Sequence, residues 1–248
     1  MTGNTYIIIG NDYESFSDNV NILTSTEMFV RMNKQHDWPR KIDSIHFGQG
    51  VNTHDREILT KELLNRNVDV ATQFESPPLE LTHKVSDENV LISAPEKLED
   101  HHYRFDLIIT DKVDRLSDHV TGKHVGAMLL MEAARQATIV ALESNYPDES
   151  YGLTVRHFDS SFSHFLFPLP SNLDVKILEK ESDNDKYFDV IVETYFYQGG
   201  INVSKVVLDL CLSKKQDLRL LEGKKANQSI NGYFDYTLYR SSQPKVAV

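Results

Sequence analysis

Residues 118–137 read DHVTGKHVGAMLLMEAARQA, and this stretch decides the fold of the chain. Its first part is a polar, glycine-containing loop that carries His119 and His124. Its second part is almost wholly apolar, and the pattern continues to Ser144. A helix that is apolar on nearly every face is a buried one, so the stretch predicts a long helix over 127–144 at the centre of a domain.

Glu132 interrupts this apolar helix with a carboxylate. Burial is costly for an unpaired charge, and it raises the pKa of a carboxylate towards the range that suits a general base. A structural alternative is an ion pair with Arg135, three residues further along the same helical face. The two interpretations are compatible, because Arg135 could hold Glu132 in place or bind a substrate anion itself.

His119 and His124 are the candidate partners of that carboxylate. Histidine titrates near neutral pH, so either side chain could take a proton from a substrate hydroxyl or return it. A zinc site would need a cysteine or a third ligand at matching spacing, and the sequence around the two histidines offers none. The sequence therefore predicts acid–base chemistry without a metal or a cofactor.

The amides of Gly126, Ala127 and Met128 should lie in the first turn of the helix. Free N–H groups at a helix N-terminus stabilise negative charge, such as a thioester oxyanion or a phosphate. The small residues at 126 and 127 would let a substrate approach this backbone closely. Equally, they could serve only to make a tight junction between loop and helix.

The composition is that of a globular protein with a sizeable core. The chain has 248 residues, of which 40% are hydrophobic and 25% charged. Its formal net charge of −11 argues against a nucleic-acid partner, because phosphate contacts need a basic face. The N-terminus lacks signal-peptide features, no apolar run is long enough to span a bilayer, and Cys211, the single cysteine, cannot form an internal disulfide. These features predict a cytoplasmic protein without membrane contact.

Residues 1–76 form the first of two predicted domains, a small α/β unit. The predicted strands cover 6–9, 42–47 and 68–74, and the predicted helices cover 26–33 and 53–66. Strands that alternate with helices favour a small, mostly parallel sheet, and Thr53 is the expected cap of the second helix. The sequence Gly-Gln-Gly at 48–50 lacks the rest of a dinucleotide fingerprint and is interpreted as a turn. A stiff pair of prolines at 77–78 places the domain boundary after residue 76.

Residues 77–248 form the second predicted domain, in which strands surround the one long helix. The predicted strands cover 103–110, 153–167, 173–177, 187–197 and 201–212. Gly199 and Gly200, between the last two strands, are typical of a tight hairpin, whose central residues need positive φ. A helix wrapped by antiparallel strands makes this an α+β domain, and a polar C-terminal tail follows it.

The run MLLMEAARQA at residues 128–137 resembles the signature of the AfsA-like family, the hotdog proteins of A-factor (γ-butyrolactone) biosynthesis. The segments 81–92 and 158–170 are similar to strands of that family, the first of them to its opening strand. More distantly, the loop histidine followed by a helical acid is similar to the hotdog-fold hydroxyacyl thioester dehydratases. The resemblance implies a single hotdog domain, in which a curved antiparallel sheet wraps a long central helix.

The resemblance also implies an acyltransferase. Such an enzyme takes a β-ketoacyl group from a thioester of acyl carrier protein or coenzyme A. It passes the group to a hydroxyl of dihydroxyacetone phosphate, a small phosphorylated acceptor, on the way to a γ-butyrolactone signal. The implied roles are His119 or Glu132 as base, His124 as the second histidine of the signature, the amides of Gly126, Ala127 and Met128 as oxyanion hole, and Lys123 or Arg135 as phosphate partners.

Two other functions stay open. A hotdog hydroxyacyl-thioester dehydratase or thioesterase would use the same histidine and glutamate, but its product would contain no glycerol-type phosphate. A non-catalytic module that binds an acyl chain or a lactone would share only the fold. Loss of activity in a Glu132→Gln protein that still binds ligand would argue against such a module.

A second copy of the chain is the expected partner. AfsA-like proteins generally carry two hotdog repeats in one chain, whereas this sequence shows one, and an unpaired sheet edge invites pairing. A homodimer would supply the second module, unless the N-terminal unit covers this edge instead. The basic residues after the last strand could form a solvated surface segment or dock an acidic acyl carrier protein, and they are Lys214, Lys215, Arg219, Lys224 and Lys225.

Overall fold

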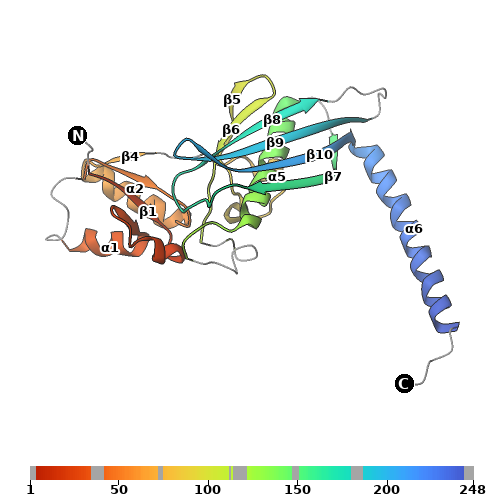
Figure 1. The fold of residues 1–248 in the computed structure, drawn as a ribbon, viewed down its shortest axis with the longest axis horizontal. Helices are drawn as coiled ribbons and strands as arrows, with labels where there is room; N and C mark the ends of the chain where they lie inside the picture. The colour runs from red at the N-terminus through yellow and green to blue at the C-terminus, as the bar shows by residue number, and fades with distance from the viewer. Residues whose placement is uncertain are drawn as a thin grey trace.

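The computed structural model describes residues 4–34, 42–71, 75–111, 113, 122–146, 151–179 and 187–242, with side chains up to residue 236. Figure 1 shows a small sheet flanked by helices at the N-terminal end, a larger sheet with one long helix against it, and a last helix that leaves the body. The predicted class, a hotdog-type α+β domain after a small α/β unit, is confirmed.

The N-terminal unit is a four-stranded parallel sheet in the order β2-β1-β3-β4. Its strands are β1 (Thr5–Ile9), β2 (Ile22–Thr24), β3 (Ser44–Phe47) and β4 (Asp69–Ala71), and its helices are α1 (Ser25–Asn33), α2 (Thr53–Asn65) and a 3-10 turn at Asn11–Phe16. The expected alternation of strands and helices is confirmed. Sequence reasoning missed β2, a strand of only three residues that runs directly into α1.

The cap predicted for α2 is wrong by one residue. Asn52, not Thr53, is the N-cap, and its side-chain oxygen accepts the N–H of Asp55 at 2.7 Å. An N-cap needs extended backbone and a side chain that reaches the N2 or N3 amide, and Asn meets both conditions here. Helix α1 is held by a full capping box, in which Thr24 and Glu27 each bind the other's backbone N–H.

The larger sheet has six antiparallel strands in the order β5-β6-β8-β9-β10-β7. The strands are β5 (Glu96–Glu99), β6 (His102–Asp106), β7 (Tyr151–Phe162), β8 (Asn172–Glu179), β9 (Tyr187–Gln198) and β10 (Ile201–Lys214). Gly199 and Gly200 make the predicted hairpin turn, with φ of 57° and 80°. The order leaves β7 at one edge of the sheet, next to β10.

Helix α5 (Ala127–Asn145) lies against this sheet, as the sequence predicts (Figure 1). Eleven of its 19 residues are buried, and eight of these share one core with the inward side chains of β6, β8, β9 and β10. The small side chains of Ala133, Ala134 and Ala137 let the helix approach the strands closely. Burial of this helix is therefore the main source of the domain's core.

The opening strand expected within 81–92 is wrong. The chain there forms the short helix α3 (Leu79–Thr82) and a 3-10 turn at Asp87–Asn89, followed only by an isolated bridge from Ile92 to Leu107. The side chain of Gln136 on α5 accepts the N–H of Leu91 and donates to the carbonyl of Asn89, both at 2.9 Å. Because a side chain satisfies these backbone groups, the segment needs no neighbouring strand.

Gln49 ties the N-terminal unit to the larger domain. Gln49 is buried, with 2% of its surface exposed. Its side-chain amide donates a hydrogen bond to the carbonyl of Leu107 at 3.0 Å and accepts one from the N–H of Ile109 at 2.9 Å. Residues 48–50 form the predicted turn, with Gly50 at φ +85°. Ile9 and Tyr13 enter the core of the larger domain, so the two units share an apolar junction. The boundary after residue 76 stays a prediction.

The polar tail expected after the last strand is in fact a helix, α6 (Lys215–Ser242). It continues directly from β10 and projects from the body (Figure 1). Within the described residues, no helix is long and apolar enough to cross a membrane.

Candidate functional site

One face of α5 is less buried than the others and carries the candidate residues. Met128, Glu132, Arg135, Ile139 and Glu143 follow one another at spacings of three or four, which places them on one face. Met128 is exposed, while the glutamates and the arginine are half-buried. Ile139 on this face is buried, whereas the charged side chains are partly open to solvent and so are available for chemistry.

Glu132 is the centre of an ion-pair network on this face. Both of its oxygens accept hydrogen bonds from the guanidinium of Arg135 at 2.8 Å. The ammonium of Lys84 lies 2.5 Å from one oxygen, and the amide of Gln136 donates to the same oxygen at 3.0 Å. The pair with Arg135 that the sequence offered as a structural alternative is thus formed. Two cations and one anion leave the network with a net positive charge.

The pKa of Glu132 is lowered, where the sequence led us to expect a raised value. Burial does raise the pKa of this carboxyl group, but the hydrogen bonds from Arg135, Lys84 and Gln136 outweigh burial and lower the pKa to about 2. The hydrogen bond to Glu132 in turn raises the pKa of Arg135. At neutral pH both groups are therefore charged, and Glu132 is an ionised hydrogen-bond acceptor.

The first turn of α5 is open. Gly126 is the N-cap, with no hydrogen bond from a side chain at this end, in contrast to the caps of α1 and α2. A Cβ built on Gly126 would meet nothing within 4 Å, and Ala127 and Met128 are exposed. Gly126 has φ −67°, so the position does not require glycine for its backbone. The open space beside the helix amides fits the predicted approach of a substrate.

Of the two predicted histidines, His119 and His124, the structure describes only His124. His124 is half-buried, and its ring lies 4.8 Å from that of Phe165, centroid to centroid. Lys123, beside it, is exposed. His119 lies outside the described residues, so its place relative to Glu132 stays a prediction.

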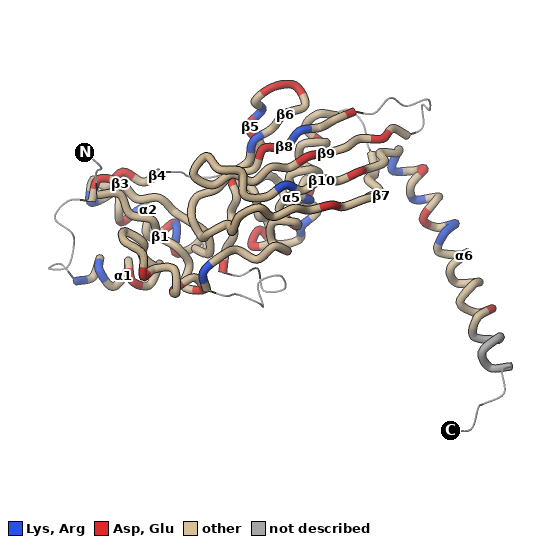
Figure 2. The backbone as a smooth tube through the Cα atoms, viewed as in Figure 1, with Lys and Arg blue, Asp and Glu red and all other residues tan. Residues whose placement is uncertain are grey.

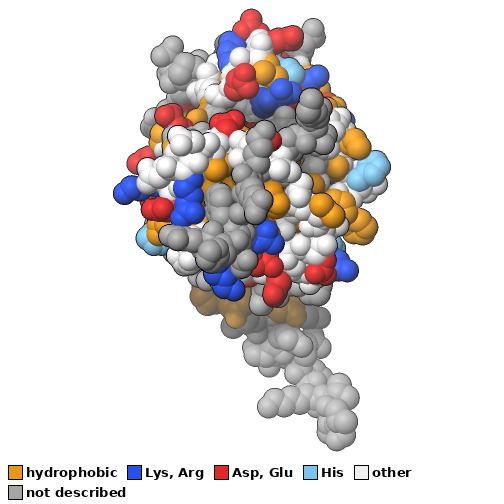
Figure 3. All heavy atoms as spheres, turned by 90° about the vertical axis from the view of Figure 1, so that its left-hand side faces the viewer, with side chains coloured by type: hydrophobic (Ala, Val, Ile, Leu, Met, Phe, Trp, Pro, Cys, Tyr) orange, Lys and Arg blue, Asp and Glu red, His pale blue; other side chains and the backbone are white. Residues whose placement is uncertain are grey.

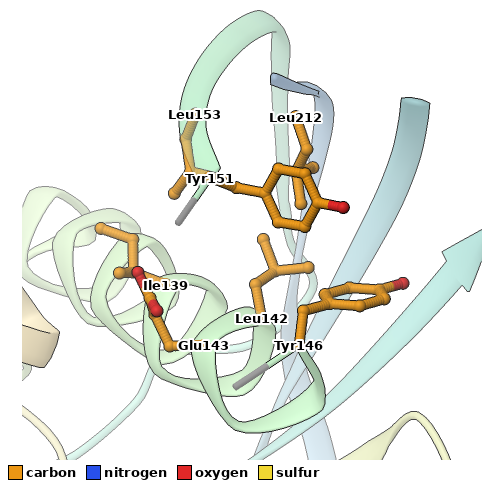
Figure 4. Close-up of a pocket in the computed structure, with 7 residues that line it drawn as sticks. All are labelled: Ile139, Leu142, Glu143, Tyr146, Tyr151, Leu153 and Leu212. Atoms are coloured by element: carbon orange, nitrogen blue, oxygen red, sulfur yellow. The ribbon is translucent and has the colours of Figure 1, made fainter. Parts of the chain in front are cut away.

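An apolar groove runs between α5 and the strands β7 and β10 (Figure 4). Two adjoining hollows share Ile139, Glu143, Tyr151 and Leu153, and so form one continuous groove. The outer hollow has a volume of about 300 Å³ and is also lined by Arg135 and His83. In Figure 4 the side chains of α5 face Tyr151 and Leu153 of β7 and Leu212 of β10 across the inner hollow. The groove is lined mainly by apolar side chains and has a guanidinium among the residues of its outer part.

Sequence reasoning missed two residues of this site, His83 and Lys84. Both belong to the turn after α3, where His83 adopts the left-handed conformation with φ 55°. That turn points Lys84 at Glu132 and brings His83 to the groove. The sequence of this stretch resembles a strand, and no local pattern links it to α5.

No group of three or more metal-ligating side chains occurs among the described residues.

The N-terminal unit presents a face on which charges of both signs are interspersed (Figure 3). Such a mixture is typical of an ordinary solvated surface.

The match to known families falls on this site. Residues 68–167 match the A-factor biosynthesis hotdog domain. The matched region contains α5, the Glu132 network and the open first turn, so the AfsA-like resemblance of the sequence is confirmed. It covers less than half of the chain and stops before β8, β9 and β10.

Solved structures give more distant similarities. A conserved protein from Pseudomonas aeruginosa is 14% identical, with 55% of this chain and 99% of that chain covered at a TM-score of 0.41. A mutant thioesterase from the same organism is 12% identical, with coverages of 57% and 99% and a TM-score of 0.41. A mutant thioesterase from Staphylococcus aureus is 10% identical, with coverages of 54% and 97% and a TM-score of 0.37. No curated protein matches the chain.

Proposed function

We propose that this protein is an AfsA-like acyltransferase that moves a β-ketoacyl group from a thioester to the hydroxyl of a small phosphorylated acceptor. Dihydroxyacetone phosphate is the acceptor that the family resemblance implies, and a γ-butyrolactone-type signal the eventual product. The observation that carries the proposal is the apolar groove along α5 with Arg135 in its outer wall, inside the part of the chain that matches the A-factor hotdog domain.

The groove fits an acyl chain and an anion together. The outer hollow of about 300 Å³ has room for such a chain, and Leu153, Val155 and Leu208 offer it apolar surface, whose burial is favourable in proportion to its area. Arg135 is about one-third exposed, at 31% of its side chain, so its guanidinium can still reach a phosphate. Arginine suits this task because its planar fork binds phosphate oxygens in a bidentate manner.

Each candidate residue then has a role. Glu132 keeps Arg135 and Lys84 in place, and with a pKa of about 2 it is a weak base at neutral pH. We assign the removal of the acceptor's proton to His119 or His124, because an imidazole can take a proton from a hydroxyl and return it. As the ester C–O bond forms and the thioester C–S bond breaks, the same imidazole would give the proton to the departing thiolate. The amides of Ala127 and Met128 would stabilise the oxyanion of the thioester carbonyl. Lys123 would help to bind the phosphate.

A thioesterase or dehydratase is the second candidate function. It would use the same groove for the acyl chain but leave Arg135 without a phosphorylated acceptor to bind. The two solved thioesterases that resemble the chain keep this alternative open, although their similarity is too low to favour it. The product separates the candidates, because only the transferase yields an ester that contains phosphate.

The test is incubation of the full chain with β-ketoacyl thioesters, with and without dihydroxyacetone phosphate, and product identification by mass spectrometry. We expect a phosphate-containing ester or butenolide that forms only with the acceptor. Free acid at the same rate in both samples would favour a thioesterase, and no turnover of any substrate a binding module. A β-ketoacyl thioester has no β-hydroxyl group to eliminate, so a third sample contains a β-hydroxyacyl thioester, and an enoyl product there would favour a dehydratase.

Arg135→Gln sharpens this test. The variant should raise the KM for the acceptor by about tenfold to a hundredfold, since a charge-assisted hydrogen bond is worth about 1.5–3 kcal/mol. Arg104→Gln is the matched control, because Arg104 also forms a bidentate pair, with Asp174 at 2.7 and 2.8 Å, on β6 and away from the groove. Equal effects of the two changes would contradict the assigned role of Arg135.

A further inference from the structure

Helix α6 is exposed along almost its whole length. It has 28 residues, and every described residue from Arg219 to Tyr236 is exposed. Its first turn is anchored, because Leu218 packs on Gly152, where an added Cβ would lie 2.4 Å from its side chain. Beyond this anchor the helix projects from the body (Figure 1).

The sequence of α6 is a poor one for a helix surrounded by water. Gly223 and Gly232 lie in its interior, and each costs about 1 kcal/mol relative to alanine. Tertiary packing of an apolar face normally supplies most of the stability of a helix. This helix has such a face, because Ile230, Tyr233 and Phe234 follow at helical spacing and are all exposed. A surface that covers this face would stabilise α6.

The charge of α6 divides it into two parts. Lysines, an arginine and acidic residues occupy its first part, whereas residues 226–236 contain one charged side chain, that of Asp235 (Figure 2). The aromatic half therefore suits an apolar protein surface better than it suits an anionic one.

The direction of α6 indicates where that surface lies. The helix starts beside the beginning of β7, the edge strand, and runs past this edge on the side away from β8 and β9 (Figure 1). A second copy that pairs with β7 would lie on that side. A 28-residue helix is about 42 Å long, and a six-stranded sheet is about 29 Å across, so α6 can reach over such a copy.

The end of β7 offers an apolar surface that matches. In an antiparallel pair related by a two-fold axis, the start of one β7 lies beside the end of the other. At its last residue and just beyond it, the chain exposes Phe162, Phe165 and Phe167 around a hollow of about 420 Å³. The ring of His124, which leads into the first turn of α5, lies against Phe165.

From these observations we propose that α6 of one copy packs its Ile230–Tyr233–Phe234 face on the Phe162–Phe165–Phe167 hollow of a second copy. The partner's helix then closes the space beside His124, and the site on α5 is complete only in the dimer. The inference rests on the sheet-edge dimer that accompanies the proposed function.

A photo-crosslinking amino acid at Tyr233 of the full chain tests the contact. We expect a dimeric adduct whose joined peptide contains residues 162–167. The control probe replaces Gln228, which lies on the opposite side of α6, and should give much less of this adduct. The proposal would be overturned if the probe at Tyr233 gave no adduct, an adduct only within one chain, or an adduct to another surface.

A second measurement uses the double variant Ile230→Asp/Phe234→Asp, whose changes are on the exposed surface of the monomer. Sedimentation equilibrium should show a dimer dissociation constant raised at least about tenfold, the loss typical of a buried apolar anchor. An unchanged constant, or a monomeric wild type whose α6 binds anionic vesicles or acyl carrier protein, would overturn the inference. Thioester turnover in the same samples reports separately on function. A crosslinked dimer without turnover overturns only the transferase, and turnover without the crosslink overturns only this contact.

Discussion

At the scale of single residues, the network around Glu132 makes a pH prediction. Its pKa is about 2 in the folded chain, below the ordinary 4.5, so the folded state favours the ionised form. The resulting stability is fully present above about pH 5 and is lost as the pH falls towards 2. We expect the melting temperature of the wild type to fall more steeply over this range than that of Glu132→Gln. Parallel curves for the two proteins would show that the carboxylate adds no pH-dependent stability.

Glu132→Gln also separates the roles assigned on α5. The change leaves Lys84 and Arg135 half-buried without their counter-charge, so it should destabilise the fold as well as raise the KM for a phosphorylated acceptor. A general base behaves differently, because its loss lowers kcat by about 10²–10⁴-fold with the fold intact. Steady-state kinetics beside thermal melts decide between positioning and catalysis. A large fall in kcat at unchanged stability would restore Glu132 as the base.

Gly126 allows a sharper test of the helix amides. A serine there has room, since nothing lies within 4 Å, and it can cap α5 by accepting the free amides of its first turn. We expect Gly126→Ser to raise the melting temperature slightly and to lower kcat by about 10²–10³-fold, the usual cost of an oxyanion donor. Gly126→Ala adds a methyl group without an acceptor and should lose less activity. Full activity in a stabilised Gly126→Ser protein would exclude these amides from the reaction.

At the scale of elements, Gln49 joins the parallel sheet to the larger domain. Gln49→Ala removes hydrogen bonds to Leu107 and Ile109 and leaves buried backbone groups unsatisfied. Such a loss costs about 1–3 kcal/mol, which should lower the urea midpoint clearly. Gln228→Ala, on the exposed surface of α6, should leave the midpoint unchanged. Equal midpoints for the two variants would mean that the junction contributes little.

The elements also show what sequence can and cannot predict. The pattern of apolar residues is local, so it predicted α5, the long strands and the Gly199–Gly200 turn closely. The contacts that build the site are not local. Lys84 contacts Glu132 across the fold, and Gln136 holds the segment that follows Lys84, at Asn89 and Leu91, in place of a strand; no spacing rule contains that information. For the same reason the structural alternative for Glu132, an ion pair within one helix, was visible in the sequence, but the lowered pKa was not.

At the scale of the whole molecule, β7 decides the assembly. It is a 12-residue strand at the edge of the sheet, with Val155 and Phe158 exposed on it, and long apolar edges invite pairing. We therefore expect a homodimer, twice the 28.4 kDa of the chain, at micromolar concentration. Val155→Asp with Phe158→Asp should shift the mass in sedimentation equilibrium towards the monomer, because like charges would meet across the two-fold axis. Leu178→Asp, an equally exposed apolar residue on the inner strand β8, should leave the dimer intact. A wild type that sediments at 28.4 kDa would contradict the prediction, and the site on α5 would then have to work within one chain.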